Sequence, residues 1–326
     1  MKKINILTCA MVALIMGCTN NDELQNVSSN YPDDNIIRVT AGVNNPMTRG
    51  GETGTTVTPY NGDFSLTVLN TKNSKYTYAN KRFTYAGGTD WNCSETLLWQ
   101  NATTSVAIAA VAPYSDTYSV YDVGPVAFSY TLNSDQTTQD PKNDLLHYFN
   151  SRFDPGKNLT KDGKLALTLN HAFCLFDINV TVGTEFNTEK GLSTDPITSA
   201  TISGIYNSAN INVWGNPVMV SRPTGIRGKI TATPGTFTPA ANAEANATKK
   251  FSCIVLPQTL SKDYFTVTLL TTTGKKYEWS PATNITIESG KKYTLNLTMG
   301  DDKVVLKEGI TAKPWESVDK GQLGTD

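Results

Sequence analysis

The sequence predicts an all-β protein that folds as two tandem β-sandwich domains. Threonine occurs 46 times and is accompanied by 14 tyrosines and 24 glycines, a mixture that favours strands and turns over helices. Apolar and polar residues alternate in many short segments, and no segment keeps a helical period beyond two or three turns. The 326 residues exceed one sandwich of about 100 residues, so two sandwiches fit the chain better.

The composition is that of a folded chain without a strongly charged face. Hydrophobic residues make up 39% and aromatic residues 9%, and the formal net charge is −1. Because there is no basic excess, nucleic acid is not expected as a partner. The chain has two histidines, His147 and His171, and neither has a nucleophile, a second ligand or a carboxylate at a meaningful spacing. We therefore expect structural histidines, and no catalytic residue, metal or cofactor.

The first 17 residues have the layout of a secretory signal peptide. Two lysines precede an apolar stretch, residues 4–16, that is too short to span a bilayer as a helix. The stretch ends at Gly17 and Cys18, which resembles the lipobox of bacterial lipoproteins. Cys18 is therefore the predicted lipidation site, followed by a flexible tether over residues 18–35. The alternative is an ordinary signal peptide with an unmodified cysteine.

The body of the protein begins with a strand that has one buried face. Its apolar positions, Ile37, Val39, Ala41 and Val43, alternate with polar or small residues. Further strands are expected, in chain order, at residues 64–68, 106–111, 126–132, 165–169, 173–182, 200–205, 251–256, 265–270 and 293–299. Turn-rich stretches separate them. A long polar stretch sets the expected domain boundary, with an N-terminal sandwich over residues 36–158 and a C-terminal one over residues 159–326.

The cysteines and tryptophans of the body each allow two interpretations. If Cys18 is lipidated, Cys93, Cys174 and Cys253 remain. Their spacing matches no metal site. Cys174 and Cys253 have apolar strand neighbours, so buried, inert thiols are favoured there, although one disulfide is possible. Three tryptophans near turns could stack on a sugar ring, although packing within the protein is favoured; they are Trp91, Trp99 and Trp214.

A polar, glycine-rich connection is expected directly after the first strand, at residues 47–51. A flexible exposed segment can enter the cleft of a protease. Arg49 is followed by Gly50 and Gly51, and a lone arginine among small residues suits a trypsin-like enzyme. Cleavage between Arg49 and Gly50 is one interpretation, and an ordinary linker arginine is the other.

Several short motifs, in order along the chain, resemble those of Bacteroides-type fimbrillins. They are a DLL segment at 143–146 with the strand at 165–176, an IVLPQ strand end at 254–258, and closing segments at 290–297 and 310–315, together with the lipobox and residues 48–50. Each motif is short, and the ordered set covers nearly the whole chain.

This resemblance implies two transthyretin-like sandwiches and a structural subunit of a type V pilus that supports adhesion. The precursor would be a lipoprotein of the outer membrane before it joins a cell-surface fimbrium. An arginine-specific protease would cut after Arg49 and release the first strand, residues 36–49. A strand of another subunit would then fill the open groove. The implied partners are other pilus subunits, the protease, the outer membrane through the lipid, and a host or bacterial surface ligand.

The donor strand is expected near the C-terminus. Val304, Leu306, Ile310 and Ala312 supply alternating apolar positions there, although Gly309 interrupts the pattern. The sequence leaves open whether the chain is a stalk, tip or anchor subunit. It also leaves an alternative function, which is a monomeric surface lipoprotein that binds glycans through an aromatic platform.

Overall fold

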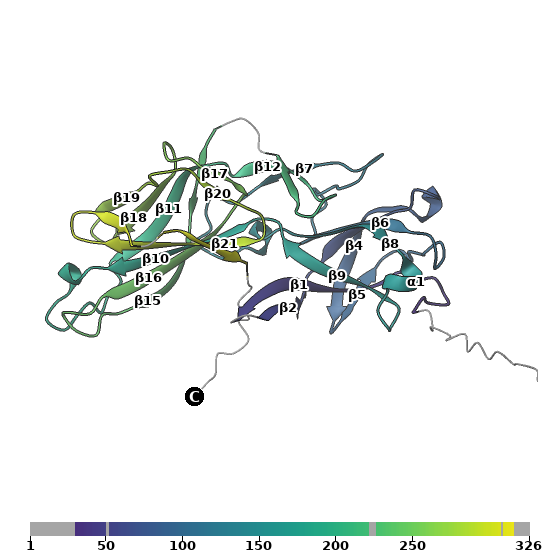
Figure 1. Ribbon diagram of the computed structural model, residues 1–326, viewed down its shortest axis with the longest axis horizontal. Helices are drawn as coiled ribbons and strands as arrows, with labels where there is room; N and C mark the ends of the chain where they lie inside the picture. Colours follow the sequence, from purple (N-terminus) through teal and green to yellow (C-terminus); the bar gives the residue numbers. More distant parts are fainter. Residues whose placement is uncertain (1–29, 50–51, 222–225, 308, 316–326) are drawn as a thin grey trace, which may run out of the picture.

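The computed structural model of the protein describes residues 30–49, 52–221, 226–307 and 309–315 (Figure 1). Within these ranges the chain forms 23 strands and one short α-helix, α1 (Pro155–Asn158). The predicted all-β class is confirmed. No helix in this part of the chain is long and apolar enough to cross a membrane.

An eight-stranded sheet encloses the N-terminal core. Its order is β2-β1-β9-β8-β6-β3-β4-β5. The strands are β1 (Arg38–Arg49), β2 (Glu52–Pro59), β3 (Phe64–Leu69), β4 (Tyr78–Gly87), β5 (Asp90–Cys93), β6 (Val106–Ala112), β8 (Leu146–Phe153) and β9 (Lys164–His171). The sheet curls so that β5 approaches β1 (Figure 1). Its apolar face surrounds one cluster of buried side chains.

Two facing sheets form the C-terminal sandwich. The larger has the order β15-β16-β10-β21-β22, and β23 also pairs with β21. The smaller has the order β14-β11-β18-β19, and β17 pairs with β20 beside them. The strands are β10 (Cys174–Val182), β11 (Ile197–Ile205), β14 (Gly228–Thr231), β15 (Thr233–Thr238), β16 (Ala247–Val255), β17 (Gln258–Leu260), β18 (Thr266–Thr271), β19 (Lys276–Trp279), β20 (Ile285–Ile287), β21 (Lys291–Met299), β22 (Val304–Leu306) and β23 (Thr311–Pro314). Their alternating side chains fill a second buried cluster.

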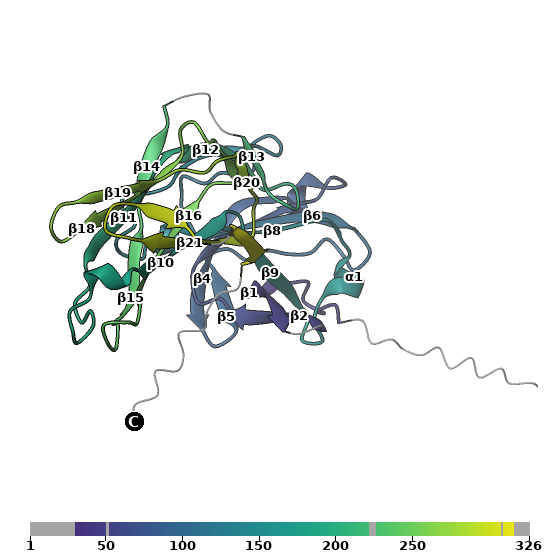
Figure 2. The same cartoon turned by 60° about the vertical axis from the view of Figure 1, so that its left-hand side comes forward.

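Strands cross between the two halves of the chain. β7 (Phe128–Thr131) pairs with β12 (Ser208–Asn212) (Figure 1). β12 also pairs with β13 (Met219–Ser221) (Figure 2). β9 follows the expected boundary in sequence and nevertheless lies in the N-terminal sheet. β6 serves both cores, because its odd and even residues belong to different buried clusters. The division at residues 158 and 159 stays a prediction.

The nine strands expected after the first one are all present, at β3, β6, β7, β9, β10, β11, β16, β18 and β21. The segment 106–111 is almost completely buried, as its apolar run predicts. Other strands, among them β4, β13 and β15, are not expected from the apolar pattern. Many of these lie at sheet edges or expose most of their side chains, so that the apolar alternation is weak.

The connection expected at residues 47–51 is only partly correct. β1 continues as a strand to Arg49, and β2 begins at Glu52 as its antiparallel partner. The two strands therefore form a hairpin, in which Arg49 pairs with Glu52. Cross-strand pairing extends β1 beyond its apolar residues, which is why apolar periodicity alone placed the end of the strand too early.

Candidate functional site

The candidate site is β1 together with the groove that it occupies. Ile37, Val39, Ala41 and Val43 belong to the N-terminal core, and none is more than 9% exposed. The predicted buried face of this strand is therefore confirmed. β1 runs parallel to β9, in register from Arg38 with Lys164 to Val43 with Leu169. Because β9 continues the sheet, β1 is an integral strand of its domain.

The other side of β1 is held by two different segments. At its start, the backbone amide of Ile37 donates to the carbonyl of Leu97 at 2.8 Å. Further along, β2 pairs with it from Gly42 onward. A Cβ atom added to Gly42 would overlap Val57 Cγ1 and would lie 2.9 Å from the carbonyl oxygen of Thr58. The approach of β2 therefore requires glycine at this position of β1.

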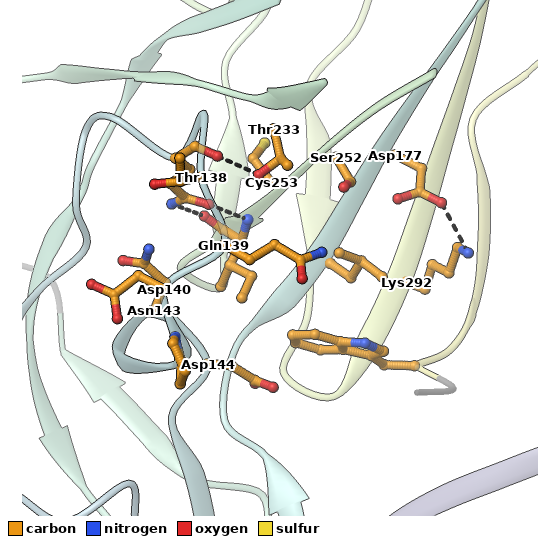
Figure 3. A pocket seen from close by; sticks show the side chains of 15 residues that line it. Thr138, Gln139, Asp140, Asn143, Asp144, Asp177, Thr233, Ser252, Cys253 and Lys292 are labelled. Carbon is orange, nitrogen blue, oxygen red and sulfur yellow. Dashed lines mark hydrogen bonds and ion pairs between the residues drawn. The ribbon is translucent and has the colours of Figure 1, made fainter. Parts of the chain in front are cut away.

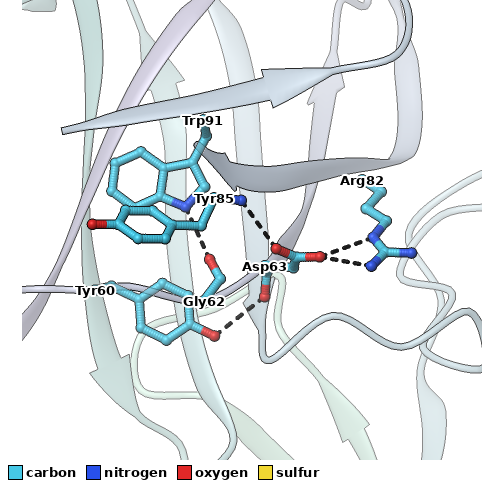
Figure 4. Close-up of polar contacts among 6 residues, drawn as sticks. All are labelled: Tyr60, Gly62, Asp63, Arg82, Tyr85 and Trp91. Carbon is cyan, nitrogen blue, oxygen red and sulfur yellow. Dashed lines mark hydrogen bonds and ion pairs between the residues drawn. The ribbon is translucent and has the colours of Figure 1, made fainter. Parts of the chain in front are cut away.

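A polar corner fixes the chain where β2 leads into β3 (Figure 4). Asp63 accepts hydrogen bonds from the guanidinium of Arg82 at 2.7 and 3.1 Å, and Trp91 Nε1 donates to the carbonyl of Gly62 at 2.9 Å. The Tyr60 hydroxyl donates to the backbone carbonyl of Asp63, and burial raises the pKa of Tyr60 above its usual value. These bonds anchor the end of β2 to the body of the domain without involving β1.

The sites expected for processing lie at the edge of the described chain. Arg49 is the last residue of β1, at the hairpin to β2. Gly50 and the expected lipidation site Cys18 lie outside the described residues. The structure thus places Arg49 where a backbone cut would separate β1 from β2.

The four expected donor residues lie at the edge of the C-terminal sandwich. β22 and β23 both pair antiparallel with β21, on the side away from β10. Val304 is buried, Ile310 is half-buried, and Leu306 and Ala312 are exposed. Val304 and Ile310 therefore contribute apolar surface to their own sandwich, whereas Leu306 and Ala312 face solvent.

An aromatic contact that the sequence analysis missed holds the end of β23. The buried indole of Trp315 stacks on the imidazole of His171, with ring centroids 3.8 Å apart. His171 Nδ1 lies 2.8 Å from Asp144 Oδ1, although the two residues are 27 positions apart in sequence. Only the motifs at 143–146, 165–176 and 310–315, considered together, could have suggested this group, because its members come from distant segments.

Asp144 and Trp315 also line a cavity of about 580 Å³ between segment 136–144 and the larger C-terminal sheet (Figure 3). Asp177 and Lys292 form an ion pair at 2.9 Å on its wall. The side chain of Gln136 bonds to both backbone groups of Ile254. The polar groups of this cavity are thus largely engaged with one another and with the backbone.

The remaining histidine and the cysteines of the described chain differ in burial. Burial lowers the pKa of His147 to about 4, so this histidine is neutral at neutral pH. Cys174 and Cys253 are buried free thiols, as predicted, and burial raises the pKa of each. Cys93 is also free. Among the described residues, no three histidine, cysteine or acidic side chains gather where they could hold a metal ion.

The three tryptophans considered for sugar binding are engaged in packing. Trp91 and Trp99 are buried in the N-terminal core. Trp214 is half-buried, and its Nε1 donates to the carbonyl of Val120 at 2.6 Å. The Trp214 ring also packs beside Tyr121 and Phe149.

The sequence pattern of the fimbrillin-like family matches residues 40–315. Among solved structures, a proposed cell adhesion protein from Bacteroides uniformis ATCC 8492 aligns with a TM-score of 0.57 and 19% identity, covering 87% of this chain and 99% of its own. Another from Bacteroides ovatus ATCC 8483 aligns with a TM-score of 0.63 and 13% identity, with the same coverage of 87% and 99%. These likenesses show a shared fold. A comparison with curated protein sequences gives no match. Because the family pattern spans most of its length, the chain belongs to the fimbrillin-like family.

Proposed function

We propose that this chain is a structural, non-catalytic subunit of a cell-surface pilus, in which β1 is a removable strand. A protease would cut after Arg49, β1 would leave, and a strand of another subunit would take its place. Family membership supports the pilus role. The observation that carries the proposal is the burial of Ile37, just before β1, and of Val39, Ala41 and Val43 within it, in a core that closes around them.

Removal of β1 would expose part of the apolar core and leave one side of β9 without a neighbouring strand, which favours binding of a replacement. Ile37, Val39 and Val43 each stabilise the core by about 1.5–3 kcal/mol, or roughly 5–9 kcal/mol together before ordering costs. β9 would also lose its partner from residue 164 to residue 169. An unpaired inner strand beside an open core binds extended segments of other chains.

The positions of the two segments favour assembly into a filament. The vacated groove would belong to the N-terminal domain, and the expected donor lies on the C-terminal sandwich. The donor segment and the acceptor groove are different surfaces, so the contact is heterologous, and a heterologous contact whose rotation does not close builds a filament. We propose that Cys18 carries the lipid that holds the precursor at the outer membrane until cleavage, and that adhesion to a surface ligand is the outcome of assembly.

Limited proteolysis of the purified precursor tests this proposal. An arginine-specific protease should produce a new N-terminus at Gly50 and a ladder of oligomers on unheated denaturing gels. The matched control is Arg49→Lys, which trypsin should cut and the arginine-specific enzyme should leave intact. An excess of synthetic peptide 36–49 should suppress the ladder by refilling the groove. The proposal fails if the cut protein keeps β1 and stays monomeric.

A further inference from the structure

Gly42 places a steric condition on any strand that replaces β1. Its position faces Val57 and the carbonyl of Thr58 so closely that a Cβ atom does not fit. Both of these residues belong to β2, whose far end the polar corner at Tyr60 and Asp63 anchors to the domain. β2 pairs with β1 alone among the described strands, and the backbone amide of Tyr60 also donates to the carbonyl of Ala41. A strand that replaces β1 and pairs with β2 in the same way would meet Val57 and Thr58 again, and it then needs a glycine at the same register position.

The C-terminal segment contains such a glycine in the same local pattern. In β1, Gly42 is followed by Val43 and is preceded by Val39 and Ile37, three and five positions earlier. The corresponding set around Gly309 is Ile310, Leu306 and Val304. Of the 24 glycines in the chain, only these two are followed by valine or isoleucine and preceded by aliphatic residues at both distances.

The local structure around Gly309 does not require a glycine. It is exposed, and a Cβ atom added there would meet no atom within 4 Å. Its φ also lies outside the left-handed region that favours glycine. The fold of this subunit therefore accepts a side chain at position 309, whereas the groove of β1 does not accept one at position 42.

We propose that residues 304–310 of a second copy of this chain enter the vacated groove in the same direction as β1, with Gly309 at the position of Gly42. This inference rests on the proposed function. In this arrangement Gly309, which interrupts the apolar alternation of the C-terminal segment, sets the register of the inserted strand. It also assigns Val304, Leu306 and Ile310 to the pockets of Ile37, Val39 and Val43, which are similar in size and already apolar.

The opposite direction fits less well. With Gly309 held at the same position, a reversed strand would place Ala312 in the pocket of Val39 and Ile310 in that of Ala41. The first pocket would be underfilled and the second overfilled. In the proposed direction the one mismatch is Glu308, which lies outside the described residues and would occupy the position of buried Ala41. A carboxylate there opposes binding, so Glu308 should limit the affinity of the exchange.

Ladder formation by full-length variants tests the register. Gly309→Val should fold with the thermal midpoint of the wild type and be cut after Arg49 at the same rate, yet form at least tenfold less ladder. The control Val305→Ala changes a side chain that would occupy the outward position of Arg38, so its ladder should stay within twofold of wild type. Glu308→Ala should increase ladder formation.

The outcomes separate this inference from the function on which it rests. If the cut wild type forms ladders and cut Gly309→Val forms them equally well, the register is wrong while strand exchange stands. The same conclusion follows if Val305→Ala loses its ladder as completely as Gly309→Val. If the cut wild type keeps β1 and forms no ladder, the proposed function fails and the register fails with it.

Discussion

At the scale of single residues, Gly42 and His147 should each affect the stability of the N-terminal sheet. Gly42 lets β2 approach β1 more closely than any side chain would permit. His147 lies in β8 and is 1% exposed, in a sheet whose strands β9 and β1 follow next in order. One residue acts through steric fit and the other through the cost of burying a charge.

Substitution of Gly42 by alanine should weaken the intact precursor. The added methyl group would push against the backbone of Thr58, and overpacking of this kind typically costs about 1–3 kcal/mol. Urea unfolding of the uncut protein measures the change in free energy. The control is Gly124→Ala, where the added Cβ meets no atom within 4 Å and which should change stability by less than about 0.5 kcal/mol. Equal effects of the two substitutions would contradict the steric argument.

His147 should make the folded state less stable in mild acid. Its pKa falls from 6.5 to about 4 on folding because burial penalises the charged form. Below pH 6.5 His147 is therefore protonated in the unfolded chain but remains neutral in the folded chain. The free energy of unfolding falls as the pH drops from 6.5 towards 4. Between pH 7 and pH 5 the loss from this group is about 2 kcal/mol.

The comparison of wild type with His147→Gln isolates that contribution. Denaturant unfolding at both pH values should give the variant a smaller loss of stability on acidification, whatever its stability at pH 7. The titration of Asp34 does not interfere with this measurement. Its hydrogen bond with Arg38 lowers the pKa of this carboxyl to about 2, so its own loss of stability occurs below pH 4. An identical pH dependence in both proteins would mean that folding does not lower the pKa of His147.

At the scale of elements, β1 and β23 differ in what holds them. β1 is held by its buried apolar face and by β9 and β2 on its two sides. β23 has mostly exposed side chains, pairs only with β21 among the described strands, and ends in the stack of Trp315 on His171. A strand with one partner and one aromatic anchor is easier to release than a strand inside a sheet.

The anchoring role of Trp315 predicts a local effect of its removal. Trp315→Ala should speed hydrogen exchange of the β23 amides at least tenfold, because the buried indole is the main apolar contact at that end of the strand. Amides in the centre of β10 should exchange at the wild-type rate. Ala312→Ser, on the exposed face of β23, serves as the control and should leave both regions unchanged. Unchanged protection of β23 in Trp315→Ala would show that strand pairing alone retains it.

At the scale of the whole molecule, strand pairing and shared core packing connect the two halves of the chain. β9 completes the N-terminal sheet and leads directly into β10 of the C-terminal sandwich. β6 contributes side chains to both cores, and β7 pairs with β12 of the other half. Such shared strands should transmit force along the molecule, which suits a unit placed in series with others.

Much of this architecture could be predicted from local sequence. The alternation at Ile37, Val39, Ala41 and Val43 identified both a strand and its buried face, because side chains in a strand point to opposite sides with a period of two. The apolar run at 106–111 predicted a buried strand for the same local reason. Free, buried cysteines at positions 174 and 253 followed from their apolar neighbours.

The tertiary structure alone decided which distant segments meet. The parallel pairing of β1 with β9, the contact of Asp144 with His171 and the stack of Trp315 on His171 join residues that no spacing relates. The need for glycine at position 42 likewise comes from the approach of Val57 and Thr58 in β2. Periodicity is a property of one strand, whereas pairing, register and close approach depend on two. The sequence therefore determined what each strand buries, and folding determined what each strand lies against.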